Sequence, residues 1–249
     1  MHLQNAVAIV TGGTGGLGRR ICRALALRGV HVAVCYATRR AEGEAVAQEV
    51  RQLGTRATVV KVDVASPESV QQLADQVVRE FGRIDILVND AAYNKWVPFS
   101  QLQDLDLETW TKILDVNLTG PFICSKAVAP IMREQHQGRI VNVGSIAGLH
   151  PIGSSIAYAV SKAALTHLTR CLAVALAPEV QVNCVAPGFM DGTVMSDNLS
   201  PEYRQRARQG SLLQRAADKD DMAAVVVEFC RTDSVTGQTL VVDSGRVFH

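Results

Sequence analysis

Short apolar runs alternate with longer segments of helical period along this chain. Many residues of the runs are Val, Ile or Ala, and apolar side chains fall on both of their alternating faces. A strand of this kind is typical of a parallel sheet that is covered by helices on both sides. The sequence therefore predicts seven parallel strands, at residues 6–11, 30–36, 58–63, 84–89, 139–145, 180–186 and 240–243.

The segments between these runs carry apolar residues at helical spacing. Strands that alternate with helices favour a doubly wound α/β fold with right-handed crossovers. No repeat and no Pro/Gly/Ser-rich linker divides the chain, so we expect a single domain over residues 1–249, with helices on both faces of one seven-stranded sheet. The helices are predicted at about 17–28, 41–53, 67–81, 107–133, 157–177 and 218–231.

Residues 189–213 break this rhythm, because the sequence there turns polar and irregular. A short helix is expected near 201–208. An insertion of this length directly after a strand is more often a lid or a binding loop than a disordered spacer. We therefore interpret this segment as a substrate lid.

Composition and charge narrow the class of protein. The 25 Lys and Arg residues nearly balance 24 Asp and Glu, and this formal charge of +1 offers no basic surplus for nucleic acid. The apolar runs are too short to span a membrane, and the first eight residues lack the pattern of a signal peptide. The six cysteines lie in apolar segments without a CxxC pair, as structural thiols in a reducing compartment do. We expect a cytoplasmic protein without a metal site, because the histidine spacing suits no zinc ligand set.

The first apolar run leads directly into a glycine-rich turn and then a helix. The turn reads Thr-Gly-Gly-Thr-Gly-Gly-Leu-Gly over residues 11–18. Glycines let a pyrophosphate approach the backbone, and the helix N-terminus favours its charge. Ordinary strand-to-helix turns also use glycine. The sequence lacks the Gly-Lys-Ser/Thr of a P-loop, which argues against a P-loop nucleotidase. The flanking strand and helix favour a dinucleotide site, with candidate contacts at Gly12, Thr14, Gly16, Leu17 and Gly18.

Further motifs follow the turn in a fixed order. Asn-Asp-Ala-Ala occupies 89–92, Val-Asn-Leu-Thr-Gly occupies 116–120, and Tyr-Ala-Val-Ser-Lys occupies 158–162. Together with the spacing Thr-Gly-x-x-x-Gly-x-Gly, they resemble the short-chain dehydrogenase/reductase family, most of all its 3-oxoacyl-[acyl-carrier-protein] reductase group. The resemblance covers essentially the whole chain. It implies a Rossmann-type fold, a nicotinamide cofactor and the catalytic residues Asn117, Ser145, Tyr158 and Lys162.

The chemistry of these residues agrees with that role. Tyr158 and Lys162 are four residues apart, so they project from one face of a helix. A tyrosine has a pKa of about 10, and a nearby ammonium favours the phenolate and lowers this pKa. Ser145 can hold a carbonyl or alcohol oxygen while Tyr158 gives or takes a proton. In the family, the asparagine that matches Asn117 holds a water that links the lysine to solvent.

The end of the second strand indicates which dinucleotide binds. An NAD-selective site usually has Asp or Glu here, but residues 35–40 read Cys-Tyr-Ala-Thr-Arg-Arg. Arg39 can bind a 2′-phosphate that a carboxylate would repel, and Thr38 and Tyr36 lie beside it. The alternative is that Arg39 and Arg40 are simply exposed residues that open a helix. We therefore favour NADP(H), with NAD(H) as the alternative.

The resemblance implies contacts that the residues alone do not. Asp90 and Ala92 depart from the usual Asn and Gly of the family. The family often has a threonine five residues after the proline, and it bonds the carboxamide. That position is Gly192 in this chain, so the next residue, Thr193, takes the role only after a small loop shift. The other implied cofactor contacts are Asp63, Val64, Asn89, Ala91, Tyr158, Lys162, Pro187 and Gly188.

The substrate is predicted less sharply than the cofactor. Candidate walls of the substrate site are mostly apolar and favour a hydrophobic ketone or a 3-oxoacyl thioester, although each could equally be a core or subunit contact. A sugar, steroid or secondary-alcohol dehydrogenase is the alternative, and a non-catalytic dinucleotide-binding regulator is a remote one. Family members are commonly tetramers, which implies a homotetramer. The candidate substrate residues are Ser145, Trp96, Ala147, His150 and Phe189.

Overall fold

A computed structural model describes residues 1–248, with Val194 described by its backbone alone. Its sheet is parallel throughout and has the strand order β3-β2-β1-β4-β5-β6-β7. All seven predicted strands are confirmed, with ends that shift by a few residues. They are β1 (Val7–Thr11), β2 (His31–Tyr36), β3 (Ala57–Lys61), β4 (Ile86–Asn89), β5 (Gly138–Val143), β6 (Val180–Pro187) and β7 (Thr239–Val242).

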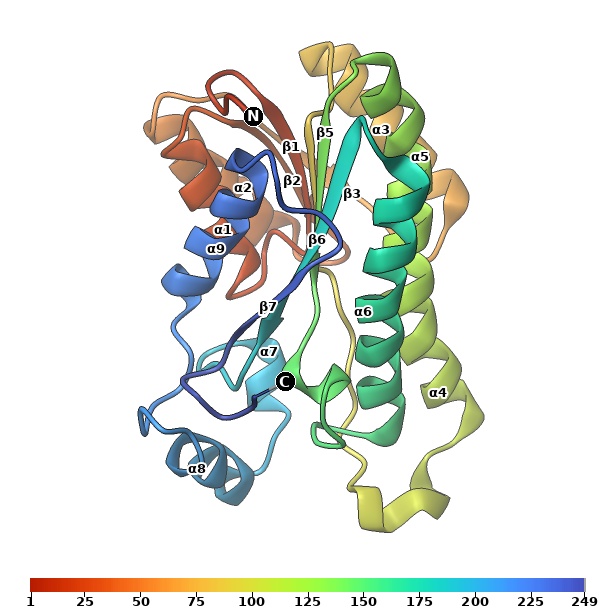
Figure 1. Cartoon of the computed structure of the whole chain (residues 1–249), viewed down its shortest axis with the longest axis vertical. Coiled ribbons are helices and arrows are strands. Elements are labelled where there is room, and N and C mark those ends of the chain that lie inside the picture. Colours follow the sequence, from red (N-terminus) through yellow and green to blue (C-terminus); the bar gives the residue numbers. More distant parts are fainter. Residues whose placement is uncertain (249) are drawn as a thin grey trace.

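Helices cover both faces of this sheet, as the continuous apolar strands predict (Figure 1). Alternate residues of β1 enter different cores: Ala8 and Val10 pack into one, and Val7 and Ile9 into the other. This two-sided burial explains why the strands lack polar alternation. One face carries α1 (Gly18–Ala26), α2 (Arg40–Gln52) and α9 (Lys219–Arg231), and the other carries α3 (Pro67–Phe81), α4 (Leu107–Leu114), α5 (Gly120–Glu134) and α6 (Ile156–Leu176).

The single helix predicted over 107–133 is wrong in its middle. A π-helical segment at Asp115–Thr119 separates α4 from α5. Pro121 stands at the start of α5 and has no N–H to donate to the carbonyl of Asn117, four residues earlier. The turn widens as a result, and π segments of this kind are frequent at functional sites.

Two short helices occupy the segment predicted as a lid. Helix α8 (Pro201–Gln209) agrees with the expected helix near 201–208, whereas α7 (Val194–Asp197) has no sequence prediction. Both lie beyond the carboxyl ends of the central strands in Figure 1. The Arg208 guanidinium donates to both oxygens of Asp191, at 2.9 and 2.6 Å, and so ties α8 to the chain that leaves β6.

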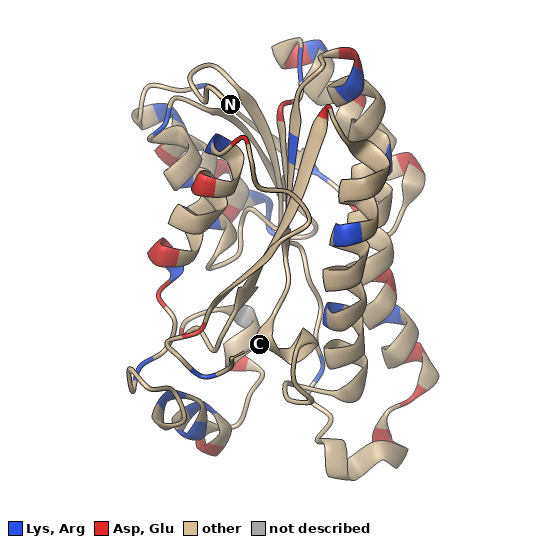
Figure 2. Ribbon diagram, in the orientation of Figure 1, with Lys and Arg blue, Asp and Glu red and all other residues tan. Residues whose placement is uncertain are grey.

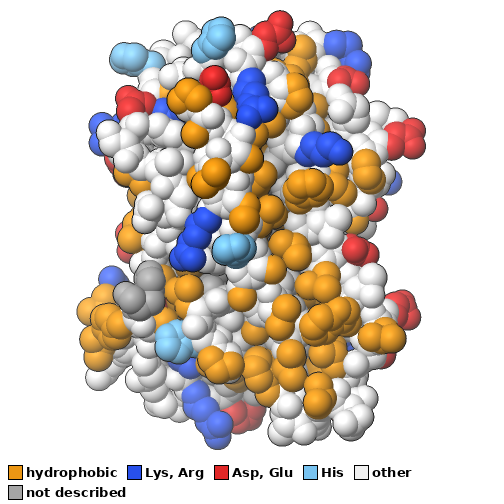
Figure 3. Space-filling model, turned by 45° about the vertical axis from the view of Figure 1, so that its right-hand side comes forward, with side chains coloured by type: hydrophobic (Ala, Val, Ile, Leu, Met, Phe, Trp, Pro, Cys, Tyr) orange, Lys and Arg blue, Asp and Glu red, His pale blue; other side chains and the backbone are white. Residues whose placement is uncertain are grey.

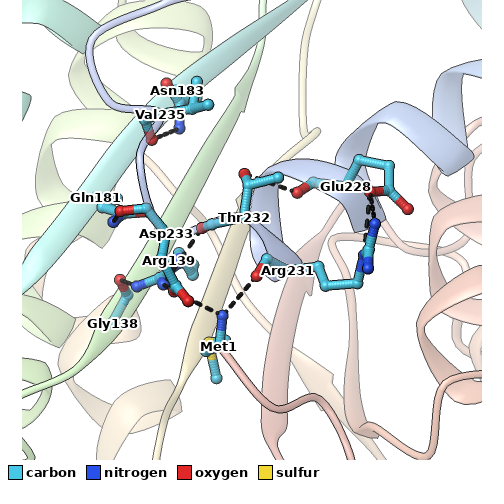
Figure 4. A network of polar contacts seen from close by, with 10 residues as sticks. All are labelled: Met1, Gly138, Arg139, Gln181, Asn183, Glu228, Arg231, Thr232, Asp233 and Val235. Carbon is cyan, nitrogen blue, oxygen red and sulfur yellow. Dashed lines mark hydrogen bonds and ion pairs between the residues drawn. The ribbon is translucent and has the colours of Figure 1, made fainter.

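A polar cluster joins β5 to the end of α9 at the opposite, amino-terminal edge of the sheet (Figure 4). The buried Arg139 lies 2.6 Å from a carboxylate oxygen of Asp233. The same oxygen accepts a hydrogen bond of 2.9 Å from the amino group of Met1, which also donates to the carbonyl of Arg231. This cluster is far from the carboxyl ends of the strands, so its role is structural.

Residues of both charge signs are spread over the helices and loops (Figure 2). Five of the six cysteines are buried free thiols, as expected, but Cys171 is exposed. Over residues 1–248, none of the helices combines the length and the apolar character that crossing a membrane requires.

Candidate active site

A cavity of about 670 Å³ opens at the carboxyl ends of the strands. The turns that follow the six strands from β1 to β6 all contribute to its wall. It lies where the chain order reverses between β1 and β4, which is the place where doubly wound sheets bind their ligands. The position of the site therefore follows from the topology.

The glycine-rich turn after β1 packs closely against the end of β4. A Cβ at Gly12 would lie 2.9 Å from the Cα of Ala91, and the positive φ of +68° disfavours any other residue. Gly12, Thr14, Gly16 and Leu17 line the cavity. Gly18 lies behind them, where a side chain would collide with the Gly12 carbonyl.

This turn fits a dinucleotide. Helix α1 begins at Gly18, so its free N–H groups and its positive dipole end lie behind the turn. The narrow cradle, which Cβ atoms would fill, lets a pyrophosphate approach these groups. The residues present thus suit the pyrophosphate of a nicotinamide dinucleotide.

The adenosine end of the cavity contains most of the predicted contacts. Its wall includes Tyr36, Thr38, Arg39, Asp63, Val64 and Ala91. Arg40 lies near Glu44 at 3.9 Å, but the exposed Arg39 has no carboxylate partner within residues 1–248. Asn89 is buried beneath the wall, where its amide donates to Asn142 at 2.8 Å and joins β4 to β5.

Ser145, Tyr158 and Lys162 all line the opposite end of the cavity. Ser145 precedes the short 3₁₀ helix Ile146–Gly148, and its hydroxyl accepts from the Ala147 N–H at 3.1 Å. Helix α6 carries the other two residues, and the Lys162 ammonium lies 5.8 Å from the centre of the Tyr158 ring. The ammonium also donates to the Val143 carbonyl at 2.8 Å, which holds it at the end of β5.

The pKa values of these groups correct one expectation. Burial raises the pKa of Tyr158 to about 12, and a hydrogen bond with Ser145 only partly offsets this rise. The prediction that the ammonium lowers the tyrosine pKa is therefore wrong for the protein alone, because desolvation dominates. Burial also lowers the pKa of Lys162 to about 8. At neutral pH the phenol is protonated and can donate its proton.

Asn117 lies in the π-helical segment and is fully buried. Its side chain accepts from the Tyr93 N–H at 2.7 Å and donates to the Tyr93 carbonyl at 2.9 Å. It also donates to the Ser161 hydroxyl at 3.1 Å. The amide thus clamps the loop after β4, which lines the cavity. Its predicted role in holding a water stays a prediction.

The chain after β6 forms the floor of the cavity with Pro187, Gly188 and Phe189. Gly192, where the family often has threonine, has a φ of +63°, which suits glycine. The next residue, Thr193, lines the cavity and caps α7 by accepting from the Ser196 N–H at 3.1 Å. A threonine is therefore present at the wall, one position later than the resemblance implies.

Two of the predicted substrate residues do not line the cavity, whereas Ser145, Ala147 and Phe189 do. Trp96 packs edge-on against Tyr203 of α8, with ring centres 5.3 Å apart, and Tyr203 takes the place at the wall. His150 is exposed on the loop after Gly148. The expectation that Trp96 and His150 form the wall is corrected accordingly.

Several wall residues had no sequence signal. Asn94, Ser154, Tyr203 and Arg246 meet at the cavity from segments that are far apart along the chain. No spacing rule connects such positions, so only the tertiary fold could reveal them. Asp90 is different, because it stands where the family usually has asparagine, and this departure is a signal in the sequence.

Comparisons with known proteins agree with this geometry. A family model for the short chain dehydrogenase matches residues 6–204. The 3-oxoacyl-[acyl-carrier-protein] reductase of Synechocystis sp. is 37% identical over 250 residues, covering 98% of each chain. The NADPH-dependent 3-quinuclidinone reductase of Rhodotorula rubra has a TM-score of 0.91 at 30% identity, covering 98% of this chain and 92% of its own. An NAD+-bound xylitol dehydrogenase also has a TM-score of 0.91, at 32% identity, covering 98% and 100%.

Proposed function

Because the chain belongs to the short-chain dehydrogenase/reductase family, we propose that it is an NADP(H)-dependent carbonyl reductase that acts on a hydrophobic ketone or a 3-oxoacyl thioester. One observation carries the proposal. A serine, a tyrosine and a lysine with acid–base chemistry line the same cavity as a glycine-rich turn that fits a dinucleotide. The proposed site of the hydride donor, the dinucleotide, thus lies in the same cavity as the proposed proton donor, Tyr158.

Ser145, Tyr158 and Lys162 each have a separate part in the chemistry. When bound, the nicotinamide supplies hydride to the substrate carbon or takes it away. The Ser145 hydroxyl donates a hydrogen bond to the carbonyl oxygen and orients it. Tyr158 donates its proton to the same oxygen, and the protonated state that burial enforces suits this direction. The positive charge of Lys162 then stabilises the phenolate that remains.

Arg39 supports NADP(H) as the cofactor. It is a guanidinium at the cavity wall without a carboxylate partner in residues 1–248, at the position where an NAD site usually places an acid. A 2′-phosphate there would gain charge-assisted hydrogen bonds. Family membership alone does not decide this point, since one structural neighbour depends on NADPH and another binds NAD+.

The substrate end of the cavity supports an apolar substrate. Ala147, Phe189 and Leu199 contribute to its wall. Residues 189–213 act as the lid in this proposal, with α8 fixed by the Arg208–Asp191 pair. The 3-oxoacyl thioester is one candidate because a relative with 37% identity is named as a reductase of that class.

A homotetramer is part of the proposal. Hydrophobic side chains gather on the face formed by α4, α5 and α6 (Figure 3). Leu107 and Val174 are 81% and 83% exposed, and Phe122 is 45% exposed, which is unusual for side chains of this size on one face. A second copy of the chain would cover them. A monomer mass measured by light scattering would contradict the proposed homotetramer.

The test of the proposed function is a substrate panel read by the consumption of NADPH. We expect turnover of hydrophobic ketones or 3-oxoacyl thioesters, and a large loss with Ser145→Ala. Turnover confined to a polyol with NAD+ would favour the dehydrogenase alternative, which the likeness to a xylitol dehydrogenase keeps open. A lack of any nicotinamide-dependent turnover across the panel would overturn the proposal.

A further inference from the structure

Asp90 places a carboxyl group at the cofactor end of the cavity, and the proposed chemistry does not use it. The residue follows β4 and lines the cavity. Its N–H donates to the Thr11 hydroxyl at 3.1 Å, which fixes its backbone against β1. The half-buried side chain lies against the glycine-rich turn: a Cβ at Gly18 would lie 2.8 Å from its Oδ2 atom. The carboxyl thus occupies the underside of the turn that fits a pyrophosphate.

The groups around this carboxyl come from two helices. From α1, the Gly18 N–H hydrogen-bonds to it, and the buried Cys22 thiol lies near. From α6, Lys162 supplies an opposing positive charge and Tyr158 a neutral phenol. Burial outweighs the lysine and the N–H group, and it raises the pKa of Asp90 to about 7. Both charge states of Asp90 are therefore populated near neutral pH.

A pyrophosphate would change this balance in one direction. Its negative charges would approach the same α1 terminus from the cavity side, so an ionised Asp90 would repel them across the turn. The ionised protein is therefore the weaker binder.

We propose that the dinucleotide binds to the form of the protein in which Asp90 is protonated, so that cofactor binding takes up a proton. This inference rests on the proposed function, because it assumes a dinucleotide at the turn. Asp90 thus changes the affinity for the pyrophosphate through its charge. The asparagine that is usual at this position in the family cannot ionise and would leave affinity independent of this proton.

The experiment measures the affinity for NADH between pH 6 and 8 in the wild type, Asp90→Asn and Asp63→Asn. NADH lacks the 2′-phosphate, whose own titration would confuse the result. The wild-type Kd should rise about tenfold over this range, in proportion to the loss of the binding-competent fraction. In Asp90→Asn the rise should disappear. Asp63→Asn is the control: Asp63 is also a carboxylate on the cavity wall, but it lies at the adenosine end and not at the turn that holds the pyrophosphate. This variant should therefore keep the wild-type pH dependence.

Calorimetry of the wild type in two buffers of different ionisation enthalpy counts the protons directly. Near pH 8 we expect uptake of close to one more proton by the wild type than by Asp90→Asn. Lys162 titrates in both proteins, and because the Asp90 carboxylate raises its pKa, the difference counts the proton of Asp90 together with the change that the substitution causes at Lys162. A wild-type Kd that does not change with pH, or a slope that Asp90→Asn retains, overturns the inference. If Asp90→Asn does not fold, a proton count near zero in the wild type overturns it. Failure of both NADH and NADPH to bind at every pH would instead overturn the proposed function.

Discussion

Replacing Tyr158 by phenylalanine removes the proposed proton donor and little else. The ring that forms part of the cavity wall remains, and only the hydroxyl and its hydrogen bond with Ser145 are lost. A single hydrogen bond of this kind contributes about 1 kcal/mol to stability. The variant should therefore fold normally, which makes its kinetics interpretable.

The expected loss of turnover follows from the position of the hydroxyl. A positioned general acid accelerates a reaction by about 10²–10⁴-fold, which corresponds to about 3–5.5 kcal/mol of activation free energy. Ser145 remains in the variant and can still hold the substrate oxygen, so some hydride transfer should survive. We expect kcat to fall by about three orders of magnitude in Tyr158→Phe.

The assay follows NADPH oxidation at saturating substrate, with the NADPH affinity measured separately by fluorescence. The Kd for NADPH should change by less than about fivefold, since at most one hydrogen bond is lost. A kcat within tenfold of the wild type would refute the role of Tyr158 as the proton donor. A loss of turnover matched by an equal loss of NADPH binding would show that the hydroxyl serves the cofactor instead.

Three other predictions concern the amino end of β4, the chain after β6 and Asp90. Asp85 is fully buried and paired in bidentate fashion with Arg83, so Asp85→Asn should lower the free energy of unfolding by about 2–4 kcal/mol in urea melts; a change below about 0.5 kcal/mol would contradict this. Lys219 donates to the carbonyls of Asp191 and Gly192, at 2.7 and 3.3 Å, and so holds the chain that leads to Thr193 on the cavity wall. Lys219→Met should therefore weaken NADPH binding several-fold while the melting temperature is retained, and unchanged affinity would exclude this support. The folded-state pKa of Asp90, about 7, exceeds the unfolded value of about 3.9, so the stability that this group contributes is lost as the pH rises through the interval. From pH 4 to 7 the wild type should therefore lose up to about 4 kcal/mol of unfolding free energy relative to Asp90→Asn, which has no group to titrate at this position. A constant difference between the two proteins would argue against this pKa.

Much of the fold could be predicted because burial on both faces gives the strands an unmistakable apolar pattern. β1 shows this directly, since its alternate residues enter two separate cores. The helix over 107–133 was predicted without its interruption because apolar periodicity does not register one missing N–H donor. Pro121 was the available signal, but its position near a helix start is also ordinary.

The site could be predicted where contacts follow from strand order and could not where they depend on packing. The turns after the parallel strands of one sheet all lie at the same edge, which is why Gly12 after β1 and Ser145 after β5 face one cavity. The edge-on contact of Trp96 with Tyr203 joins segments about a hundred residues apart, and no local pattern encodes it. The pKa of Tyr158 was misjudged for a related reason. Helical spacing reveals the nearby lysine but not the extent of burial that outweighs it.

The most direct test of the proposed function compares the affinities for NADPH and NADH at one ionic strength, in the wild type and in Arg39→Ala. We expect the wild type to prefer NADPH by tenfold or more, about 1.4 kcal/mol. Arg39→Ala should lose this preference while its affinity for NADH is unchanged, because Arg39 lies at the adenosine end of the cavity and carries no structural ion pair within residues 1–248. Equal or tighter binding of NADH by the wild type would contradict the phosphate contact and favour a dehydrogenase, and binding of neither would contradict the oxidoreductase itself.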